Sequence, residues 1–553
     1  MRFDSIVALS LVLSVVAPAA AAFAAPPPPA DVQALLDRRV AQAPQTGIIV
    51  GIVDGDETTV YKAGTAANAA PLDEHTEFEI GSVTKTFTAT ILASMVLDHT
   101  VDLHDPVQRY VPAGVHVPSR GGKQITLLTL ATQHSGLPRL PANMAPKDPN
   151  DPYADYSFAN LYAFLNGYTL PRDPGATFEY SNLGISLLGD ALANRERASY
   201  GDLVRARVLA PLGMNQTFVV TPGARISRMA TPHDADGVVV KPWTFTAIAP
   251  AGAISSDLAD MLRYVRCNMG SGPLARACLF AQQPRDTFPG NRIGLVWWTG
   301  AMRSIVHHGG DTYGFHASVA ISSDHRRGVV VLANGGGSVD GLAVHLIDAA
   351  VPFQQTTLPA EIALTSQQLD EYAGAYANGS TVYTIKREGD QLLAQISGQQ
   401  FARIYPSAKD HFFYKVVDAQ LDATRDANGK VNAFVLHQDG QKIVFVRSGM
   451  TVPTLPPESA TSPPEVALDA ATLDGYVGQY VAGAGAAFVI ARTTDGISVQ
   501  LTGQPAFPLY ASAKDHFFLK VVEAQIEFQR DATGTITGLV LHQDGRVLTA
   551  ARQ

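Results

Sequence analysis

The sequence predicts an α/β (α+β) fold in which an antiparallel sheet flanked by helices, with a mainly helical subdomain, precedes two small antiparallel β-barrels. Three observations predict it. Strand patterns occur early and again after residue 290, an apolar helical pattern lies between them, and short strands repeat late in the chain. A chain of 553 residues is too long for one ordinary domain, so two or three domains are expected.

The N-terminus has the pattern of an exported protein. Met1 and Arg2 precede an apolar run from Ile6 to Val16, and small residues follow up to Ala22-Phe23-Ala24, a typical cleavage sequence. We therefore predict a signal peptide at residues 1–24 and a periplasmic or secreted protein. No integral membrane segment is expected after signal removal, because the apolar run is shorter than a membrane span.

Composition narrows the class of partner. The net charge is −9, 46% of the residues are hydrophobic and 16% are charged, and no basic block occurs. Nucleic acid is therefore not an expected partner, and a small-molecule or peptide substrate fits better. Composition gives no information on the oligomeric state.

The first globular domain is predicted at residues 31–352, and strands begin it. Residues 47–53 and 58–61 are strand-like and flank Asp54-Gly55-Asp56, which predicts a β-hairpin with a tight turn. One sheet built from both ends of this domain, with helices packed on it, also accommodates the later strand candidates. These are Ile293–Thr299, Ser304–His308, Phe315–Ser322 and Gly328–Leu332.

Ser82 and Lys85 lie three residues apart, just after the extended segment Phe78–Ile80. Residues at this spacing share a helix face, so the amine could reach the serine hydroxyl and activate it as a nucleophile. The alternative is an N-cap serine followed by a solvated lysine. An apolar residue recurs every four positions, which predicts a helix with one buried face. These residues are Val83, Phe87, Ile91 and Met95.

A second helix is predicted from Asp257, with Ser255 or Ser256 as its cap. No cofactor or metal is expected. Cys267 and Cys278 could form one local disulfide or remain buried thiols, and two ligands do not make a zinc site. The polar loop around His233 has no His-Glu-x-x-His partner and is interpreted as structural.

An internal repeat follows the first domain. Lys409–Phe413 recurs as Lys514–Phe518, and Leu436–Gly440 recurs as Leu541–Gly545, both at an offset of 105 residues. The hairpin-like pattern of each copy is long enough for a small antiparallel barrel.

The repeat sets the remaining domain boundaries. We predict barrels at residues 365–450 and 468–553, joined by a semi-rigid linker at 453–465 that is rich in Pro, Ser and Thr. His411 and His516, each followed by two phenylalanines, are interpreted as packed residues rather than ligands.

Two further motifs belong with Ser82. Tyr180-Ser181-Asn182 lies on a loop entering an apolar helical run, and His308-Gly309-Gly310-Asp311 ends a strand candidate with a backbone that could approach a ligand closely. In this order the three motifs resemble the signatures of the penicillin-recognising serine hydrolases, which include class C β-lactamases, D-Ala-D-Ala carboxypeptidases, D-aminopeptidases and related esterases. Further segments that resemble this family are Leu130–Pro138, Pro174–Phe178, Pro211–Met214 and Pro250–Ser255.

The resemblance implies a β-lactamase/transpeptidase-like fold and a set of roles. Ser82 would attack a carbonyl and become acylated, and Lys85 and Tyr180 would share the proton transfers, with the identity of the base left open. The oxyanion hole would use the backbone N–H groups of Ser82 and Asp311. Asn182 would hold the acyl-side amide of the substrate, and His308 and Gly310 would line the site.

One departure from the family pattern bears on the substrate. The family usually has Lys-Thr-Gly where this chain has His308-Gly309-Gly310, a form that resembles D-aminopeptidases and some esterases. The lysine of the usual motif is a permanent cation that can bind a substrate carboxylate. Here it is replaced by the imidazole of His308, which is mostly neutral at pH 7. The two barrels also resemble those of some D-aminopeptidases, either as stabilising appendages or as elements that restrict access to Ser82.

The leading hypothesis is therefore an exported serine hydrolase that forms an acyl-enzyme with D-amino-acid-containing peptides or amides, of the D-aminopeptidase or D-Ala-D-Ala carboxypeptidase type. A β-lactamase and a small-ester esterase are the alternatives within the family. A penicillin-binding sensor or interaction protein is the alternative outside catalysis. A classical α/β-hydrolase is not favoured, because no Gly-x-Ser-x-Gly surrounds Ser82.

Overall fold

The residues described in the computed structural model begin at residue 26 of the chain. The predicted signal peptide at 1–24 and all but the last residue of the predicted linker at 453–465 therefore lie outside the described residues. None of the helices that the structure describes is long and apolar enough to cross a bilayer. The described residues are 26–43, 45–67, 70–223, 228–288, 291–300, 305–351, 353, 359–378, 381–396, 401–415, 419–438, 441–447, 465–482, 486–493, 496–501, 507–519, 524–531, 533–543 and 546–553.

An eight-stranded antiparallel sheet organises the first domain, in the order β2-β1-β13-β12-β11-β10-β9-β8. Strand β1 pairs with β2 through the predicted hairpin and with β13 from the other end of the domain. The prediction of one sheet built from both ends is therefore confirmed. The strands are β1 (Gly47–Asp54), β2 (Glu57–Gly64), β8 (Asp286–Phe288), β9 (Asn291–Ile293), β10 (Trp298–Gly300), β11 (Val306–Asp311), β12 (His316–Ile321) and β13 (Arg327–Ala333).

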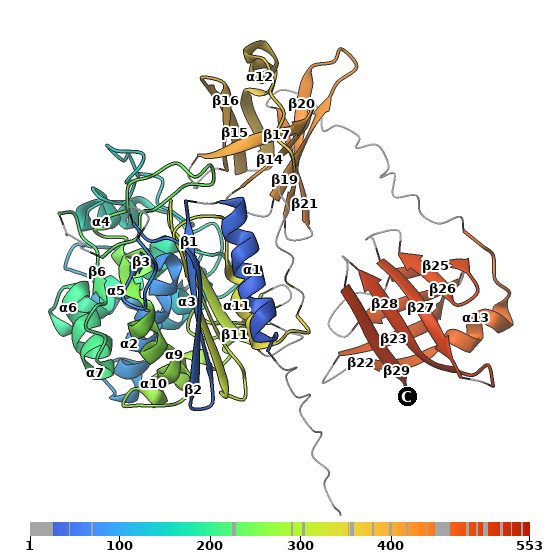
Figure 1. Ribbon diagram of the computed structural model, residues 1–553, viewed down its shortest axis with the longest axis horizontal. Helices are drawn as coiled ribbons and strands as arrows, with labels where there is room; N and C mark the ends of the chain where they lie inside the picture. The colour runs from blue at the N-terminus through green and yellow to red at the C-terminus, as the bar shows by residue number, and fades with distance from the viewer. Residues whose placement is uncertain are drawn as a thin grey trace, which may run out of the picture. The chain divides into compact units, whose positions relative to one another are not determined.

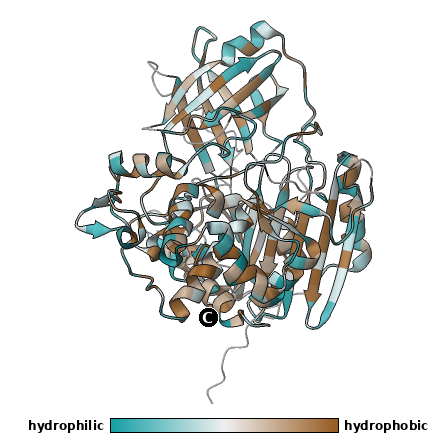
Figure 2. Ribbon diagram, turned by 90° about the vertical axis from the view of Figure 1, so that its left-hand side faces the viewer, coloured by the Kyte–Doolittle hydropathy of each residue, from teal (hydrophilic) through white to brown (hydrophobic). Residues whose placement is uncertain are grey.

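Helices cover both faces of this sheet (Figure 1). Alternate residues of a strand point to opposite faces, so Ile48 and Val50 pack in one buried cluster with α1 (Pro29–Gln42) and α11 (Asp340–Ile347). Ile49 and Val53 pack in a second cluster with α9 (Leu258–Asn268) and the helical subdomain. Figure 2 shows hydrophobic stretches on the strands and on the helices packed against them.

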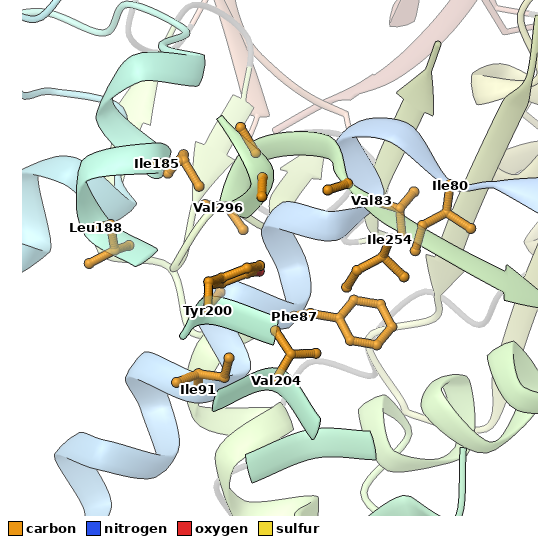
Figure 3. Packing of buried hydrophobic residues seen from close by; sticks show 14 of the residues in the cluster. Ile80, Val83, Phe87, Ile91, Ile185, Leu188, Tyr200, Val204, Ile254 and Val296 are labelled. Carbon is orange, nitrogen blue, oxygen red and sulfur yellow. The ribbon is translucent and has the colours of Figure 1, made fainter. Parts of the chain in front are cut away.

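Helix α2 (Thr84–Leu97) lies inside the domain and is buried on nearly all sides from Thr84 to Ala93, not on one face as predicted. Its threonines explain the difference, because their hydroxyls bond internally. Thr88, for example, donates to the Pro250 carbonyl at 2.9 Å. Figure 3 shows Phe87 and Ile91 of this helix among buried side chains from several other elements.

The remaining helices and short strands form the mainly helical subdomain and its attachment to the sheet. The helices are α3 (Leu127–Ala131), α4 (Phe158–Gly167), α5 (Asn182–Glu196), α6 (Tyr200–Val204), α7 (Ala210–Leu212), α8 (Ala249–Gly252) and α10 (Ala275–Gln282), with the single turns η1 (Gly81–Val83), η2 (Val107–Tyr110) and η3 (Arg205–Leu209). The short strands are β3 (Glu77–Glu79), β4 (Ser119–Arg120), β5 (Lys123–Gln124), β6 (Phe218–Val219) and β7 (Ile254–Asp257).

Two local predictions were wrong. The single strand predicted at Ile293–Thr299 is divided into β9 and β10, because Val296 adopts a left-handed conformation with φ of 58° that turns the chain. Helix α9 is capped by the carboxylate of Asp257, which accepts from the Asp260 N–H at 2.8 Å. The predicted serine caps lie instead in strand β7.

A disulfide joins two helices of the first domain. Cys267 is near the end of α9 and Cys278 lies within α10, and the two Cα atoms are 6.0 Å apart. Both side chains are buried.

Two closed eight-stranded antiparallel barrels follow, as predicted. Each is preceded by a short helix, α12 (Ser366–Tyr372) or α13 (Ala470–Tyr476). Barrel 1 contains β14 (Gly374–Asn378), β15 (Thr381–Glu388), β16 (Gln391–Ile396), β17 (Ala402–Ala408), β18 (His411–Phe413), β19 (Ala419–Arg425), β20 (Val431–Gln438) and β21 (Gln441–Arg447). Barrel 2 contains β22 (Gly478–Ala482), β23 (Ala486–Thr493), β24 (Gly496–Leu501), β25 (Phe507–Ala513), β26 (His516–Leu519), β27 (Ala524–Arg530), β28 (Ile536–Gln543) and β29 (Arg546–Arg552).

The repeated histidines are not packed, which corrects the prediction for His411 and His516. Both begin a strand and are exposed, whereas the phenylalanine that follows each of them is buried. His411 instead pairs across the strands with Asp422, with Nδ1 and Oδ1 2.7 Å apart. Barrel 2 forms a compact unit of its own, and barrel 1 belongs to the same unit as the first domain.

Candidate active site

Ser82 and Lys85 are joined by a hydrogen bond at the start of α2. Ser82 lies in the turn η1, and Lys85 is in the first turn of the helix, so the two side chains point the same way. The Nζ atom of Lys85 is 2.7 Å from Ser82 Oγ and donates to the Ala251 carbonyl of α8, also at 2.7 Å. The amine therefore has two fixed partners, one of which is the hydroxyl.

The protonation of Lys85 is controlled by its surroundings. The side chain is completely buried, and no carboxylate within ion-pair distance is found in the described part of the chain. Burial, and secondarily the positive charge of Arg139, lower the pKa of Lys85 well below its usual value. A lowered pKa favours the neutral amine, which is the form of Lys85 that can accept a proton from Ser82.

Tyr180 reaches the same point from the loop before α5. The adjacent Ser181 holds this loop, because its hydroxyl accepts from the Gly184 N–H at 2.8 Å and donates to the Pro138 carbonyl at 2.6 Å. Gln133 accepts the Ser181 N–H at 2.8 Å. As a result the Tyr180 ring centroid lies 5.0 Å from Lys85 Nζ.

Arg139 is a functional candidate that the sequence reasoning missed. Arg139 is exposed, and its guanidinium carbon lies 5.1 Å from the Tyr180 ring centroid. Its backbone carbonyl accepts the N–H groups of Asn182 and Leu183 at 3.0 and 3.2 Å. The spacing of motifs along the sequence does not point to this arginine. It comes close to Tyr180 only because the loop after Leu130–Pro138 folds back towards the start of α5.

Asn182 is the first residue of α5, two positions after Tyr180. Its side-chain oxygen is buried, and no hydrogen-bond partner for it is found within the described ranges. A buried carbonyl oxygen of this kind can accept an N–H from a ligand.

Strand β11 runs directly against the turn that carries Ser82. A Cβ atom on Gly310 would lie 2.1 Å from the Ile80 carbonyl oxygen and 2.8 Å from the Ser82 nitrogen. A Cβ on Gly81 would lie 2.7 Å from the Asp311 nitrogen. Only glycine permits this approach, which brings the backbone N–H groups of Ser82 and Asp311 to one place.

His308 is buried on the same strand and is neutral. Burial, and secondarily the charge of Lys85, lower the pKa of His308 to about 3. Its Nδ1 lies 2.6 Å from the Gly309 carbonyl, which can only accept, so the proton sits on Nδ1. The Nε2 lone pair is then left to accept, and the Trp298 ring lies 5.2 Å from the imidazole.

Glu79 is a second residue that the sequence reasoning did not single out. It lies in β3, three residues before Ser82, and its side chain is 2% exposed. Burial raises the pKa of Glu79 to about 8, so this carboxyl is largely protonated at neutral pH.

The comparison with protein families gives two matches. The beta-lactamase family matches residues 32–351, which is more than half of the chain. A domain of unknown function, DUF3471, matches twice, at residues 358–447 and 462–552. The two DUF3471 matches contain the strands of barrel 1 and barrel 2.

Named relatives share the first domain. A beta-lactamase of Pseudomonas fluorescens is 27% identical over 55% of this chain and 94% of its own length. The D-alanyl-D-alanine-carboxypeptidase/endopeptidase AmpH of Escherichia coli K12 is 31% identical over 41% of this chain and 58% of its own length. Penicillin-binding protein 4* of Bacillus subtilis is 23% identical over 73% of this chain and 95% of its own length.

Solved structures agree on the fold. A crystal structure of a class C beta-lactamase superposes with a TM-score of 0.50 at 23% identity, over 57% of this chain and 95% of its own. This likeness supports the β-lactamase-like fold of the first domain.

Proposed function

This chain belongs to the beta-lactamase family, and we propose that it is an exported serine hydrolase in which Ser82 forms an acyl-enzyme with D-amino-acid-containing peptides or amides. The observation that carries the proposal is the 2.7 Å contact between Lys85 Nζ and Ser82 Oγ, made by a completely buried amine. A lysine in this setting can serve as a base, whereas a solvated lysine could not.

The acylation step follows from this contact. Ser82 Oγ bonds to the substrate carbonyl carbon while its proton passes to the neutral Nζ of Lys85. Tyr180 donates its phenolic proton to the leaving amine as the carbon–nitrogen bond breaks, and the Lys85 ammonium then returns a proton to the Tyr180 phenolate. Water then attacks the ester, and its proton restores the Ser82 hydroxyl.

The transition state carries negative charge on the former carbonyl oxygen. The backbone N–H groups of Ser82 and Asp311 are the proposed donors to this oxygen, held by the glycine contacts of β11. The free acceptor on Asn182 would bind the amide N–H on the acyl side of the substrate. These roles use only backbone and side-chain groups of the first domain.

His308 supports the substrate class. A neutral imidazole with a free Nε2 lone pair accepts hydrogen bonds and does not attract a carboxylate. A substrate amine or amide N–H is therefore favoured next to it, as in an N-terminal D-amino acid or a D-amino-acid amide. A D-Ala-D-Ala carboxypeptidase would need a cation at another position to bind the C-terminal carboxylate of its substrate. Arg139 could supply that cation.

Export is proposed from the N-terminal sequence pattern, and the relatives named above are bacterial beta-lactamases, carboxypeptidases and penicillin-binding proteins. Detection of a mature N-terminus after residue 24 in the periplasm or medium would support it. A cytoplasmic protein that keeps its first residues would contradict it.

One experiment tests the reaction. Wild type and Ser82→Ala are incubated with a penicillin, a D-Ala-terminated peptide, a D-amino-acid amide and a short acyl ester, and intact mass and product are measured. Turnover of the amide or peptide that is lost in Ser82→Ala supports the proposal. Turnover of penicillin alone indicates a β-lactamase, turnover of the ester alone indicates an esterase, and a stable adduct without release indicates a penicillin-binding sensor.

A further inference from the structure

One carboxylate of the first domain is bound by three side chains of barrel 1. Asp236 accepts from Arg403 Nη1 and from the Tyr405 hydroxyl, both at 2.7 Å, and from Lys415 Nζ at 2.6 Å. The side chains of Asp236, Arg403 and Lys415 are 22%, 27% and 16% exposed. Such partly buried, charge-assisted contacts are stronger than ordinary surface ion pairs.

A second carboxylate completes this group. Glu361 lies 3.3 Å from Arg403 and 3.4 Å from Lys415, so the two cations face two acids. Both cations also stack on the Tyr405 ring, at 4.5 and 3.9 Å from its centroid. We call these five residues the Asp236 junction: Asp236, Glu361, Arg403, Tyr405 and Lys415.

The loop that carries Asp236 packs against the turn between β11 and β12. A Cβ atom on Gly314, in that turn, would lie 2.5 Å from Pro232 Cβ and 2.7 Å from Val240 Cγ2. The loop is also tied down at its start, because the Asn334 side-chain amide donates to the Thr231 carbonyl at 2.8 Å. The turn therefore rests on the loop of residues 231–240.

The same turn begins directly after the proposed oxyanion donor. Asp311 ends β11 and pairs with His316 at the start of β12, and the Thr312 N–H donates to the Phe315 carbonyl at 3.0 Å. A shift of the loop would therefore move the turn and, through it, the Asp311 N–H. Asp236 is thus linked to Asp311 by contacts between neighbouring segments: the loop of residues 231–240 contacts Gly314, and Gly314 lies in the turn that begins after Asp311.

Barrel 2 lacks one residue of this arrangement. At the repeat offset of 105, Arg403 corresponds to Pro508, whereas Tyr405 corresponds to Tyr510. Barrel 2 closes with Pro508 in its strand β25, so the barrel fold does not need an arginine there. The arginine of barrel 1 is thus accounted for by Asp236 and Glu361 and not by barrel packing.

We propose that barrel 1 is a positioning element for the active site, in which the Asp236 junction holds the loop of residues 231–240 against Gly314 and so fixes the Asp311 N–H beside Ser82. This rests on the proposed function of Ser82. The five junction residues touch no proposed reacting atom and act through the loop. Loss of the junction therefore slows the chemical step and leaves initial substrate binding in place.

The test uses the full-length protein and a fluorescent penicillin as the acylating probe, with the apparent binding constant and the acylation rate at saturation measured separately. Loss of one oxyanion donor costs about 100- to 1000-fold, so its displacement in Asp236→Asn and Arg403→Gln is expected to slow acylation at least about tenfold. The apparent binding constant is expected to stay close to that of wild type, and the melting temperature is measured to show that each variant is folded under the assay conditions. Asp236→Glu, which keeps the charge, is expected to recover part of the rate.

Tyr405→Phe and Tyr510→Phe form a matched pair in the two barrels, and only Tyr405→Phe is expected to slow acylation. Acylation within twofold of wild type in both Asp236→Asn and Arg403→Gln overturns the proposal, as does an equal loss in the two tyrosine variants. If Asp236→Asn does not fold, the acylation rates of Arg403→Gln and of the two tyrosine variants are used to test the proposal. Absence of any Ser82-dependent reaction of the wild type with the penicillin, the D-Ala-terminated peptide, the D-amino-acid amide and the short acyl ester would instead refute the proposed function.

Discussion

Lys85 Nζ lies 2.7 Å from Ser82 Oγ, and the charge of Arg139, whose guanidinium lies 5.1 Å from the Tyr180 ring centroid, acts on that amine. Burial and this neighbouring charge both disfavour the ammonium form of Lys85. Both effects favour the neutral amine, which is the form that can take up a proton, so the pH response of the pair should depend on Arg139.

Arg139→Gln is expected to raise the pKa of Lys85, because it removes the second cause that lowers it. The catalytic form of Lys85 is the neutral amine, so the acid limb of the acylation pH profile should move to higher pH. Arg139→Lys keeps the charge and is the control that should leave the limb nearly unchanged. An unshifted limb in Arg139→Gln would exclude this electrostatic link.

Gly310→Ala is expected to reduce acylation about 100-fold or more, because the new methyl group would meet the Ile80 carbonyl and the Ser82 nitrogen and push β11 away from the oxyanion site. Gly300→Ala in β10 is a matched control, since a Cβ there would meet no atom within 4 Å. Acylation rates and melting temperatures of the two variants should be compared. Equal activity would mean that the close approach is not required.

Glu79→Gln is expected to change how stability depends on pH. The pKa of Glu79 is about 8 in the folded protein against a usual 4.5, so the folded state retains a proton that the unfolded state releases. The stabilising effect of protonated Glu79 is complete below pH 4.5 and is lost as pH rises towards 8, by at most about 1.4 kcal/mol per pH unit.

Urea unfolding of wild type and Glu79→Gln at several pH values measures this effect. The neutral glutamine should flatten the fall in the free energy of unfolding over that range. Parallel curves for the two proteins would show that Glu79 is ionised in the folded state.

His308→Lys is expected to favour substrates that end in a carboxylate. It replaces a neutral imidazole by a cation on β11, at a position where burial and Lys85 now suppress positive charge. The measurement is the ratio of kcat/KM for a D-Ala-terminated peptide to that for a D-amino-acid amide, which cancels a general loss of activity. His308→Gln, which stays neutral, should leave the ratio near the wild-type value, and an equal rise in both variants would contradict the charge argument.

Local patterns were sufficient for much of the architecture. The hairpin of β1 and β2 follows from an Asp-Gly turn between two strand-like segments, and the barrels follow from repeated short strands. The motifs of Ser82, Tyr180 and His308 could be found because their residue types and order carry the family resemblance. The structure brings these three residues together near Lys85.

Predictions from local sequence patterns failed where the burial of a side chain depends on a residue that is distant in sequence. His411 is exposed because its strand turns that side chain outward to Asp422, and the threonines of α2 are buried because Tyr200, Tyr264 and the Pro250 carbonyl bond to them. No periodicity in the segment itself contains these partners.

The sequence alone therefore determined the fold class, the two barrels and the three motifs, since each depends on spacing or repetition along the chain. Only the tertiary structure decided that Arg139 acts on Lys85, that Glu79 is buried and that Asp236 contacts barrel 1. The physical reason is that pKa values, close backbone contacts and ion pairs depend on distance and burial. Both are set by packing between segments far apart in the sequence.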